Sequence, residues 1–221
     1  MAFLHHFSLL LFALTLSLAI ISTYAKKNSC HEPIIMQNFD MNRVIGLWYI
    51  FSHHRHSFEA GCDCLSSEVL SIDANTLQVW NCCQKSKVSN LTQECDIGVN
   101  KVWLVDPEKK TANFLFTKIG SSVESNLWVV DTDYENYMIV DGCDHVSNEE
   151  SIEVFWIMSR SKILKSADLK KIGEVLRTHS FDRSKLIREK HDVHLCSAKK
   201  PNRKHDSTDH HQHNHHDETN V

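Results

Sequence analysis

Short runs of β-branched and aromatic residues recur along this chain, with turn residues between them about every ten positions. Asp73-Ala74-Asn75, Asp106-Pro107-Glu108-Lys109 and Asp133-Tyr134-Glu135 carry residues that favour tight turns. Such short connections make successive strands antiparallel neighbours. The pattern predicts eight strands, over residues 45–54, 62–72, 77–86, 93–104, 112–118, 127–132, 136–142 and 152–159. Eight strands suit a closed up-and-down barrel, so we expect an all-β fold.

One helix is expected after the last of these strands. Its apolar residues recur at helical spacing and would form a single face: Leu169, Ile172, Val175 and Leu176. Ser166 is expected to cap the helix N-terminus, and Asp168 suits the dipole of the first turn. We therefore predict one C-terminal α-helix packed by one face on the outside of the barrel.

The two ends of the chain differ from its middle. An uncharged apolar stretch from Phe7 to Thr23 ends on Thr23-Tyr24-Ala25. A membrane anchor is the alternative reading, but about 15 apolar residues are short for a bilayer span of about 20, and the small residues suit signal peptidase. We predict a signal peptide over residues 1–25, a barrel domain over 26–196 and a disordered histidine-rich tail over 197–221. The mature protein is expected to be secreted and extracellular.

The cysteines are even in number, which in an exported chain favours disulfides. They are Cys30, Cys62, Cys64, Cys82, Cys83, Cys95, Cys143 and Cys196. A zinc site among the crowded middle cysteines is the alternative, but the paired C-x2-C spacing of a zinc ribbon is missing. Spacing alone leaves the disulfide pairing open. The sequon Asn90-Leu91-Thr92 predicts a glycan on an exposed turn.

Charge excludes one class of partner. The chain has 24 Lys and Arg against 28 Asp and Glu, for a formal net charge of −4. A nucleic-acid-binding domain carries a basic surface, so we expect no nucleic-acid partner.

Three short motifs occur in a fixed order along the chain. Asn38-Phe39-Asp40 precedes Gly46-Leu47-Trp48 at the first strand, Asp133 to Tyr137 forms a later turn, and Trp156 to Arg160 ends a late strand. Together they resemble the three conserved regions of the lipocalins, most closely the apolipoprotein D and insect bilin-binding (Lazarillo-like) branch. The resemblance spans about Cys30 to Cys196 and implies an eight-stranded lipocalin barrel.

This resemblance also implies two disulfides, Cys30–Cys143 and Cys64–Cys196. Further bridges would then lie among Cys62, Cys82, Cys83 and Cys95. It implies a carrier of a small hydrophobic ligand, such as a lipid, retinoid, sterol or tetrapyrrole pigment. An enzyme is not expected, because a lipocalin-type isomerase needs a free pocket thiol and an even cysteine count leaves none.

Strand alternation predicts how the barrel closes. Trp48, Ile50, Ser52 and His54 would share one face, and Val154, Trp156, Met158 and Arg160 would share another. If the first and last strands pair antiparallel, Trp48 lies beside Arg160 at one end and His54 lies near Val154 at the other. A guanidinium over an indole contributes about 0.5 to 2 kcal/mol and would seal its end. Alternation thus predicts Trp48 and Arg160 as barrel-closing residues, and the resemblance to the lipocalins implies the same structural role for Gly46, Asp133 and Tyr134.

The other end is expected to be the mouth of a ligand cavity with an apolar floor and polar points near the opening. Its predicted lining is Trp156, Met158, Val154, Ile50, Ser52 and His54. The alternative is that Trp156 only fills a solid core, because an eight-stranded barrel encloses either side chains or one small ligand. A cell-surface receptor and a membrane surface are further candidate partners, and the oligomeric state stays open.

Histidines suggest a second candidate function. The tail interleaves imidazoles with carboxylates at His205, His210, His211, His213, His215 and His216, a composition that chelates Zn or Cu. A pH-sensitive solvated tail fits the same residues. With His54 and His56 expected at the mouth, the alternative function is an extracellular metal- or haem-sequestering protein. The predicted carrier function requires no cofactor.

Overall fold

The computed structural model describes residues 30–54, 59, 62–85, 93–146, 150–179, 181–191 and 196. The predicted signal peptide, the histidine-rich tail, Asn90 and His56 lie outside these ranges. Within them, no helix has the length and apolar character needed to cross a bilayer.

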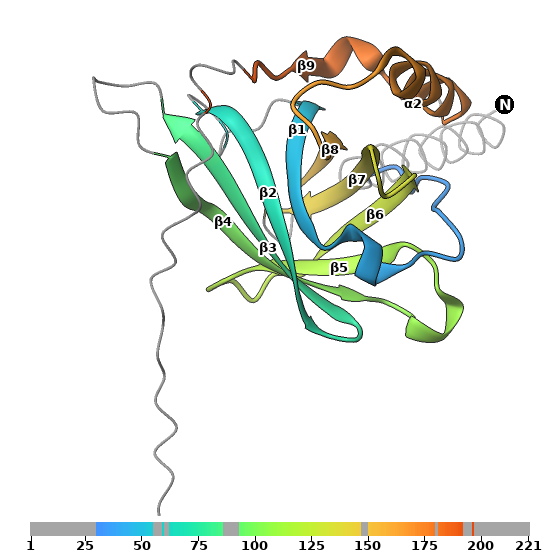
Figure 1. Cartoon of the computed structure of the whole chain (residues 1–221). Helices are drawn as coiled ribbons and strands as arrows, with labels where there is room; N and C mark the ends of the chain where they lie inside the picture. Colours follow the sequence, from blue (N-terminus) through green and yellow to red (C-terminus); the bar gives the residue numbers. More distant parts are fainter. Residues whose placement is uncertain are drawn as a thin grey trace, which may run out of the picture.

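Strands β1 to β8 form a closed antiparallel barrel (Figure 1). Each strand pairs with the next along the chain, and β1 pairs with both β2 and β8, so that the sheet closes on itself. The strands are β1 Gly46–His54, β2 Cys62–Asp73, β3 Thr76–Lys85, β4 Gln93–Leu104, β5 Asn113–Lys118, β6 Ser125–Thr132, β7 Tyr137–His145 and β8 Ser151–Ser159. The predicted eight-stranded barrel is confirmed, and the predicted strands differ from these only at their ends.

A ninth strand was not predicted. β9, Leu186–Arg188, follows the short 3-10 helix η4, Arg183–Lys185, and pairs antiparallel with the end of β1. Three residues are too few to show an alternation of apolar and polar side chains. By pairing with β1 beyond the stretch that β2 reaches, β9 covers backbone that would otherwise be an open edge.

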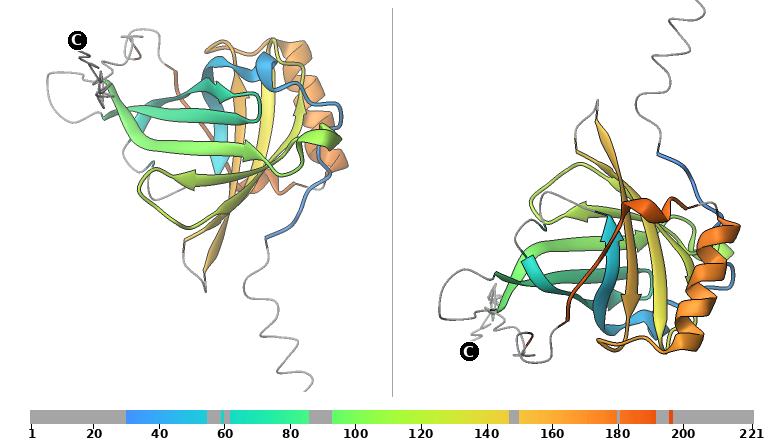
Figure 2. Two further views of the ribbon diagram at one scale, coloured as in Figure 1. Left: turned by 90° about the horizontal axis from the view of Figure 1, so that it is seen from below. Right: turned by 90° about the horizontal axis from the view of Figure 1, so that it is seen from above.

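Helix α2, Ser166–Thr178, packs on the outside of the barrel, as predicted (Figure 2). Its buried residues Ile172, Val175 and Leu176 join an apolar cluster with outward-facing barrel residues such as Phe155. Two details of the prediction are wrong. The N-cap is Lys165, without a side-chain cap, because Ser166 is already the first helical residue. Leu169 in the first turn is 39% exposed, so the buried face begins one turn later.

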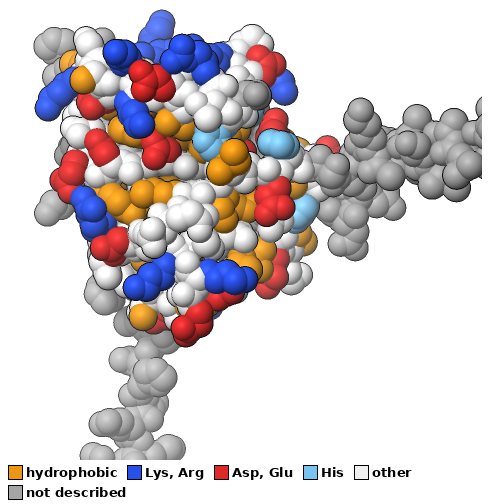
Figure 3. Space-filling model, turned by 90° about the vertical axis from the view of Figure 1, so that its right-hand side faces the viewer, with side chains coloured by type: hydrophobic (Ala, Val, Ile, Leu, Met, Phe, Trp, Pro, Cys, Tyr) orange, Lys and Arg blue, Asp and Glu red, His pale blue; other side chains and the backbone are white. Residues whose placement is uncertain are grey.

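The outer surface of the protein carries both charged and hydrophobic side chains. On the face shown in Figure 3, acidic and basic side chains are interspersed, with only small groups of hydrophobic side chains between them. The main apolar clusters are therefore inside the barrel and under α2.

Disulfides tie both ends of the domain to the barrel wall. Cys30 is bonded to Cys143 in β7, and Cys196 is bonded to Cys64 in β2, the two pairs that the resemblance implied. A third bridge, Cys62–Cys83, joins β2 to β3. Cys82 is also disulfide-bonded, and its Cα partner in the β3–β4 register is Cys95.

A β-bulge in β1 changes which side chains point inward. Ile50 pairs with Met158, but Ser52 pairs with Ile157 and His53 with Trp156, so β1 holds one extra residue at this point. One extra residue reverses the facing of every later side chain. His53 therefore shares the inner face with Trp156, whereas Ser52 and His54 point outward.

Candidate ligand-binding cavity

One end of the barrel is sealed around Trp48. This side chain is fully buried, and its Nε1–H donates to the carbonyl of Val44 at 2.7 Å. Val44 ends the 3-10 helix η1, Met41–Val44, whose buried residues Met41 and Val44 join the interior cluster. The indole thus ties η1 across the end of the barrel.

Arg160 holds this end together from outside. Its guanidinium carbon lies 3.7 Å from the centroid of the Trp48 ring. The three guanidinium nitrogens donate to the carbonyls of Arg43, Leu47 and Tyr134 at 2.8, 3.1 and 3.2 Å. One side chain therefore joins η1, β1 and the turn before β7.

Two further predicted residues shape the turn that Arg160 reaches. Asp133 accepts hydrogen bonds from the backbone N–H groups of Glu135, Asn136 and Tyr137. Partial burial opposes ionisation, but these bonds and that from the Asn136 side chain outweigh it and lower the pKa of Asp133. The Tyr134 hydroxyl accepts from the backbone N–H of Asp40 at 3.0 Å.

Gly46 stands where β1 meets Arg160. Its φ is +107°, a value that L side chains rarely adopt, and a Cβ there would lie 3.3 Å from Nη1 of Arg160. All five residues predicted to close the barrel therefore meet at one end.

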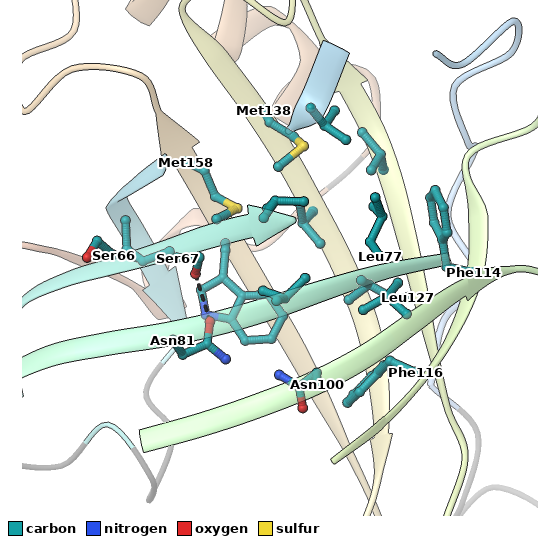
Figure 4. Close-up of a pocket in the computed structure, with 18 of the residues that line it drawn as sticks. Ser66, Ser67, Leu77, Asn81, Asn100, Phe114, Phe116, Leu127, Met138 and Met158 are labelled. Atoms are coloured by element: carbon teal, nitrogen blue, oxygen red, sulfur yellow. Dashed lines mark hydrogen bonds between the residues drawn. The ribbon is translucent and has the colours of Figure 1, made fainter. Parts of the chain in front are cut away.

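An apolar cavity occupies the barrel interior beyond this seal, with a volume of about 120 Å³. Figure 4 shows its two ends: Ser66, Ser67 and Asn81 lie toward one end, and Leu77, Phe114 and Leu127 toward the other. The Ser67 hydroxyl donates to Oδ1 of Asn81 at 2.7 Å. Met138 and Met158 line the wall between, with unbranched side chains that adapt to an irregular occupant.

The structure places only half of the predicted lining at the cavity. Ile50, Trp156 and Met158 line it, whereas Ser52, His54 and Val154 do not. The bulge in β1 is the reason for the first two errors. Ser52 donates instead to the carbonyl of Ile187 in β9, and the His54 ring packs 5.4 Å from that of Phe155 on the outer side.

Val154 faces the same side of β8 as Trp156, but it lies two residues nearer the start of the strand. There it pairs with Gly142 of β7. A Cβ on Gly142 would lie 2.9 Å from Cγ2 of Val154, so the valine occupies the space that the glycine leaves. The bulge also removes the predicted pairing of His54 with Val154, because His53 is the residue that pairs with Trp156.

Sequence reasoning missed a buried charged cluster beside the cavity. Oε2 of Glu59, a cavity-lining residue, lies 2.8 Å from Nδ1 of His53, and Oε2 of Glu189 lies 3.4 Å from Nε2 of the same ring. Burial favours the neutral ring, but the hydrogen bonds to Glu189 and Glu59 prevail and raise the pKa of His53 to about 9. His53 is therefore an imidazolium at neutral pH. Simple alternation placed His53 on the outside, because it does not include the bulge in β1. Glu59 was not assigned a facing, because it lies between two predicted strands.

The predicted metal function has no counterpart in the described residues, which hold no group of three or more His, Cys, Asp or Glu side chains placed to bind a metal ion. The tail histidines lie outside those residues, so the tail site stays a prediction.

Comparison with known proteins gives consistent matches. The model of the Lipocalin / cytosolic fatty-acid binding protein family matches residues 75–193. Apolipoprotein D of Macaca fascicularis is 25% identical over 157 residues, covering 71% of this chain and 79% of that protein. Lazarillo protein of Schistocerca americana is 25% identical over 173 residues, covering 76% and 78%. The solved structure of insecticyanin from the tobacco hornworm Manduca sexta shares the fold, with a TM-score of 0.60 at 24% identity over 77% of this chain and 90% of that chain.

Proposed function

This chain belongs to the Lipocalin / cytosolic fatty-acid binding protein family, and from that premise we propose that it is a secreted carrier of a small hydrophobic molecule. The resemblance to the apolipoprotein D and Lazarillo-like branch is confirmed by its relatives. The observation that carries the proposal is a barrel sealed at the Trp48–Arg160 end around an apolar cavity. We propose no catalytic step, and we base secretion on the signal-like residues 1–25.

Affinity in such a site comes from burying apolar ligand surface against walls that already exist. Each Å² removed from water contributes about 25 cal/mol, and a preformed wall loses little entropy on binding. The few polar lining groups would orient the ligand. A lipid, retinoid, sterol or tetrapyrrole that exceeds the present cavity volume would be accommodated by new rotamers of Met138 and Met158.

Trp156→Ala tests whether this cavity is the binding site. Titration with N-phenyl-1-naphthylamine, a neutral apolar dye that fluoresces away from water, is expected to show one binding site in the native protein. The variant is expected to bind the dye about tenfold more weakly, because about 50 Å² of lost contact corresponds to about 1.3 kcal/mol. The fold should be kept, since Trp156 is only partly buried.

The matched control is Ile163→Ala, which removes an apolar side chain that is 73% exposed. Its dye affinity should equal that of the native protein. Equal affinity in the native protein and Trp156→Ala would place dye binding elsewhere, and loss of the β-sheet circular dichroism signal in Trp156→Ala would contradict its assignment to the cavity wall.

A further inference from the structure

A single carboxylate interrupts the apolar lining of the cavity. Among the described residues that line it, Glu59 is the one with an ionisable side chain. That side chain is 6% exposed, so it is held away from solvent. An isolated buried carboxylate is costly, and such a group persists only when its surroundings hold it.

Two neighbours hold Glu59 at the cavity wall. Nε1–H of Trp156 donates to its Oε1 at 3.1 Å, and Nδ1 of His53 lies 2.8 Å from its Oε2. Glu189 contacts the other side of the same imidazole. Two carboxylates around one imidazolium leave the cluster with one net negative charge, and Glu59 is the member that lines the cavity.

The cavity wall also holds an acceptor to which none of the described residues donates. This acceptor is the buried Oδ1 of Asn100, whereas Oδ1 of neighbouring Asn81 already accepts from Ser67 (Figure 4). A carboxylate has about four acceptor positions, so Glu59 can accept more than its two present contacts. A buried acceptor left unpaired costs about 1 to 3 kcal/mol, which a donor on a bound ligand would recover.

Resting on the proposed carrier function, we infer that Glu59 makes the cavity selective for neutral or cationic amphiphiles that carry an N–H or O–H donor, and against anionic lipids. A ligand ammonium beside Glu59 is attracted in a site that excludes water. A ligand carboxylate at the same place meets a like charge, which disfavours its ionised form. Glu59 is thus a specificity-determining residue that acts by direct contact with the ligand head group.

Three probes that share the same ten-carbon chain and differ only in head group test this inference: decylamine, 1-decanol and decanoate. Each is measured by its displacement of N-phenyl-1-naphthylamine at pH 7.4, below the concentration at which it forms micelles. The native protein should bind decylamine about tenfold or more tightly than decanoate, the ratio expected from one hydrogen-bonded charge contact. Glu59→Gln keeps the side-chain shape and an acceptor for Trp156. It should reduce the ratio to within about threefold, because decylamine loses its charge contact and decanoate no longer meets a like charge. The affinity for 1-decanol, which donates one neutral hydrogen bond, should fall less than that for decylamine.

Glu108→Gln is the matched control, because it makes the same change of charge on an exposed residue that does not line the cavity. It should keep the full preference for decylamine. Glu189→Gln gives a second variant should Glu59→Gln fold poorly, since it neutralises the cluster without changing the lining and should weaken the preference.

Decanoate binding as tightly as decylamine in the native protein would overturn the inference without any variant. So would an unchanged ratio in Glu59→Gln, and both results would leave the carrier function intact if 1-decanol still binds. Failure of all three alkyl probes and of the dye would instead overturn the carrier function, and the inference with it.

Discussion

Trp48→Ala is expected to lower the free energy of unfolding by about 3 to 5 kcal/mol, the usual cost of removing a large buried aromatic side chain. The indole is completely buried at the sealed end. Its loss opens a cavity, breaks the hydrogen bond to Val44 and leaves the Arg160 guanidinium without the ring beneath it. Urea unfolding followed by circular dichroism measures the change.

The neighbouring Leu47→Ala is the control for this variant. Leu47 is 41% exposed, so its truncation should cost much less than that of Trp48. A loss below about 1 kcal/mol for Trp48→Ala would contradict the assignment of Trp48 to the sealing of the barrel.

His53 is expected to make stability depend on pH in the alkaline range. Its folded-state pKa, about 9, lies above the ordinary value of 6.5, so its ion pairs contribute fully below pH 6.5 and are lost as pH rises through about 9. The difference corresponds to about 3 kcal/mol. The facing charges are Glu59 and Glu189, and desolvation of the ring opposes them.

Urea unfolding of the native protein and of His53→Gln, each at pH 6 and pH 9.5, measures this contribution. The stability difference between the two proteins should shrink by about 3 kcal/mol at the higher pH, while titrations elsewhere cancel. A difference that does not vary with pH would show that His53 is neutral in the folded protein.

Local patterns predicted the barrel and its sealed end well. Alternating strands and tight turns are signals that neighbouring residues carry, so the eight strands could be read from the chain. Trp48 and Arg160 lie before the bulge in β1 and after β8, where simple alternation still holds. Ile50 was placed inside for the same reason.

The errors in the predicted cavity lining arise from structural features that do not follow from the alternation of side chains along a strand. A single extra residue in β1 exchanged the roles of His53 and His54 and moved Ser52 outward, although no glycine or proline marks the bulge. Glu59 could not be placed because it lies between strands, and β9 is too short to show a period. Disulfide pairing depends on three-dimensional proximity, so only the resemblance could suggest it.

The carrier function is tested most directly by mass spectrometry of the protein purified from its native source, first under native and then under denaturing conditions, with its absorption spectrum recorded alongside. We expect a non-covalent organic adduct that is present in the native spectrum and lost on denaturation. A native protein without any organic adduct, which also fails to bind N-phenyl-1-naphthylamine, would contradict the account.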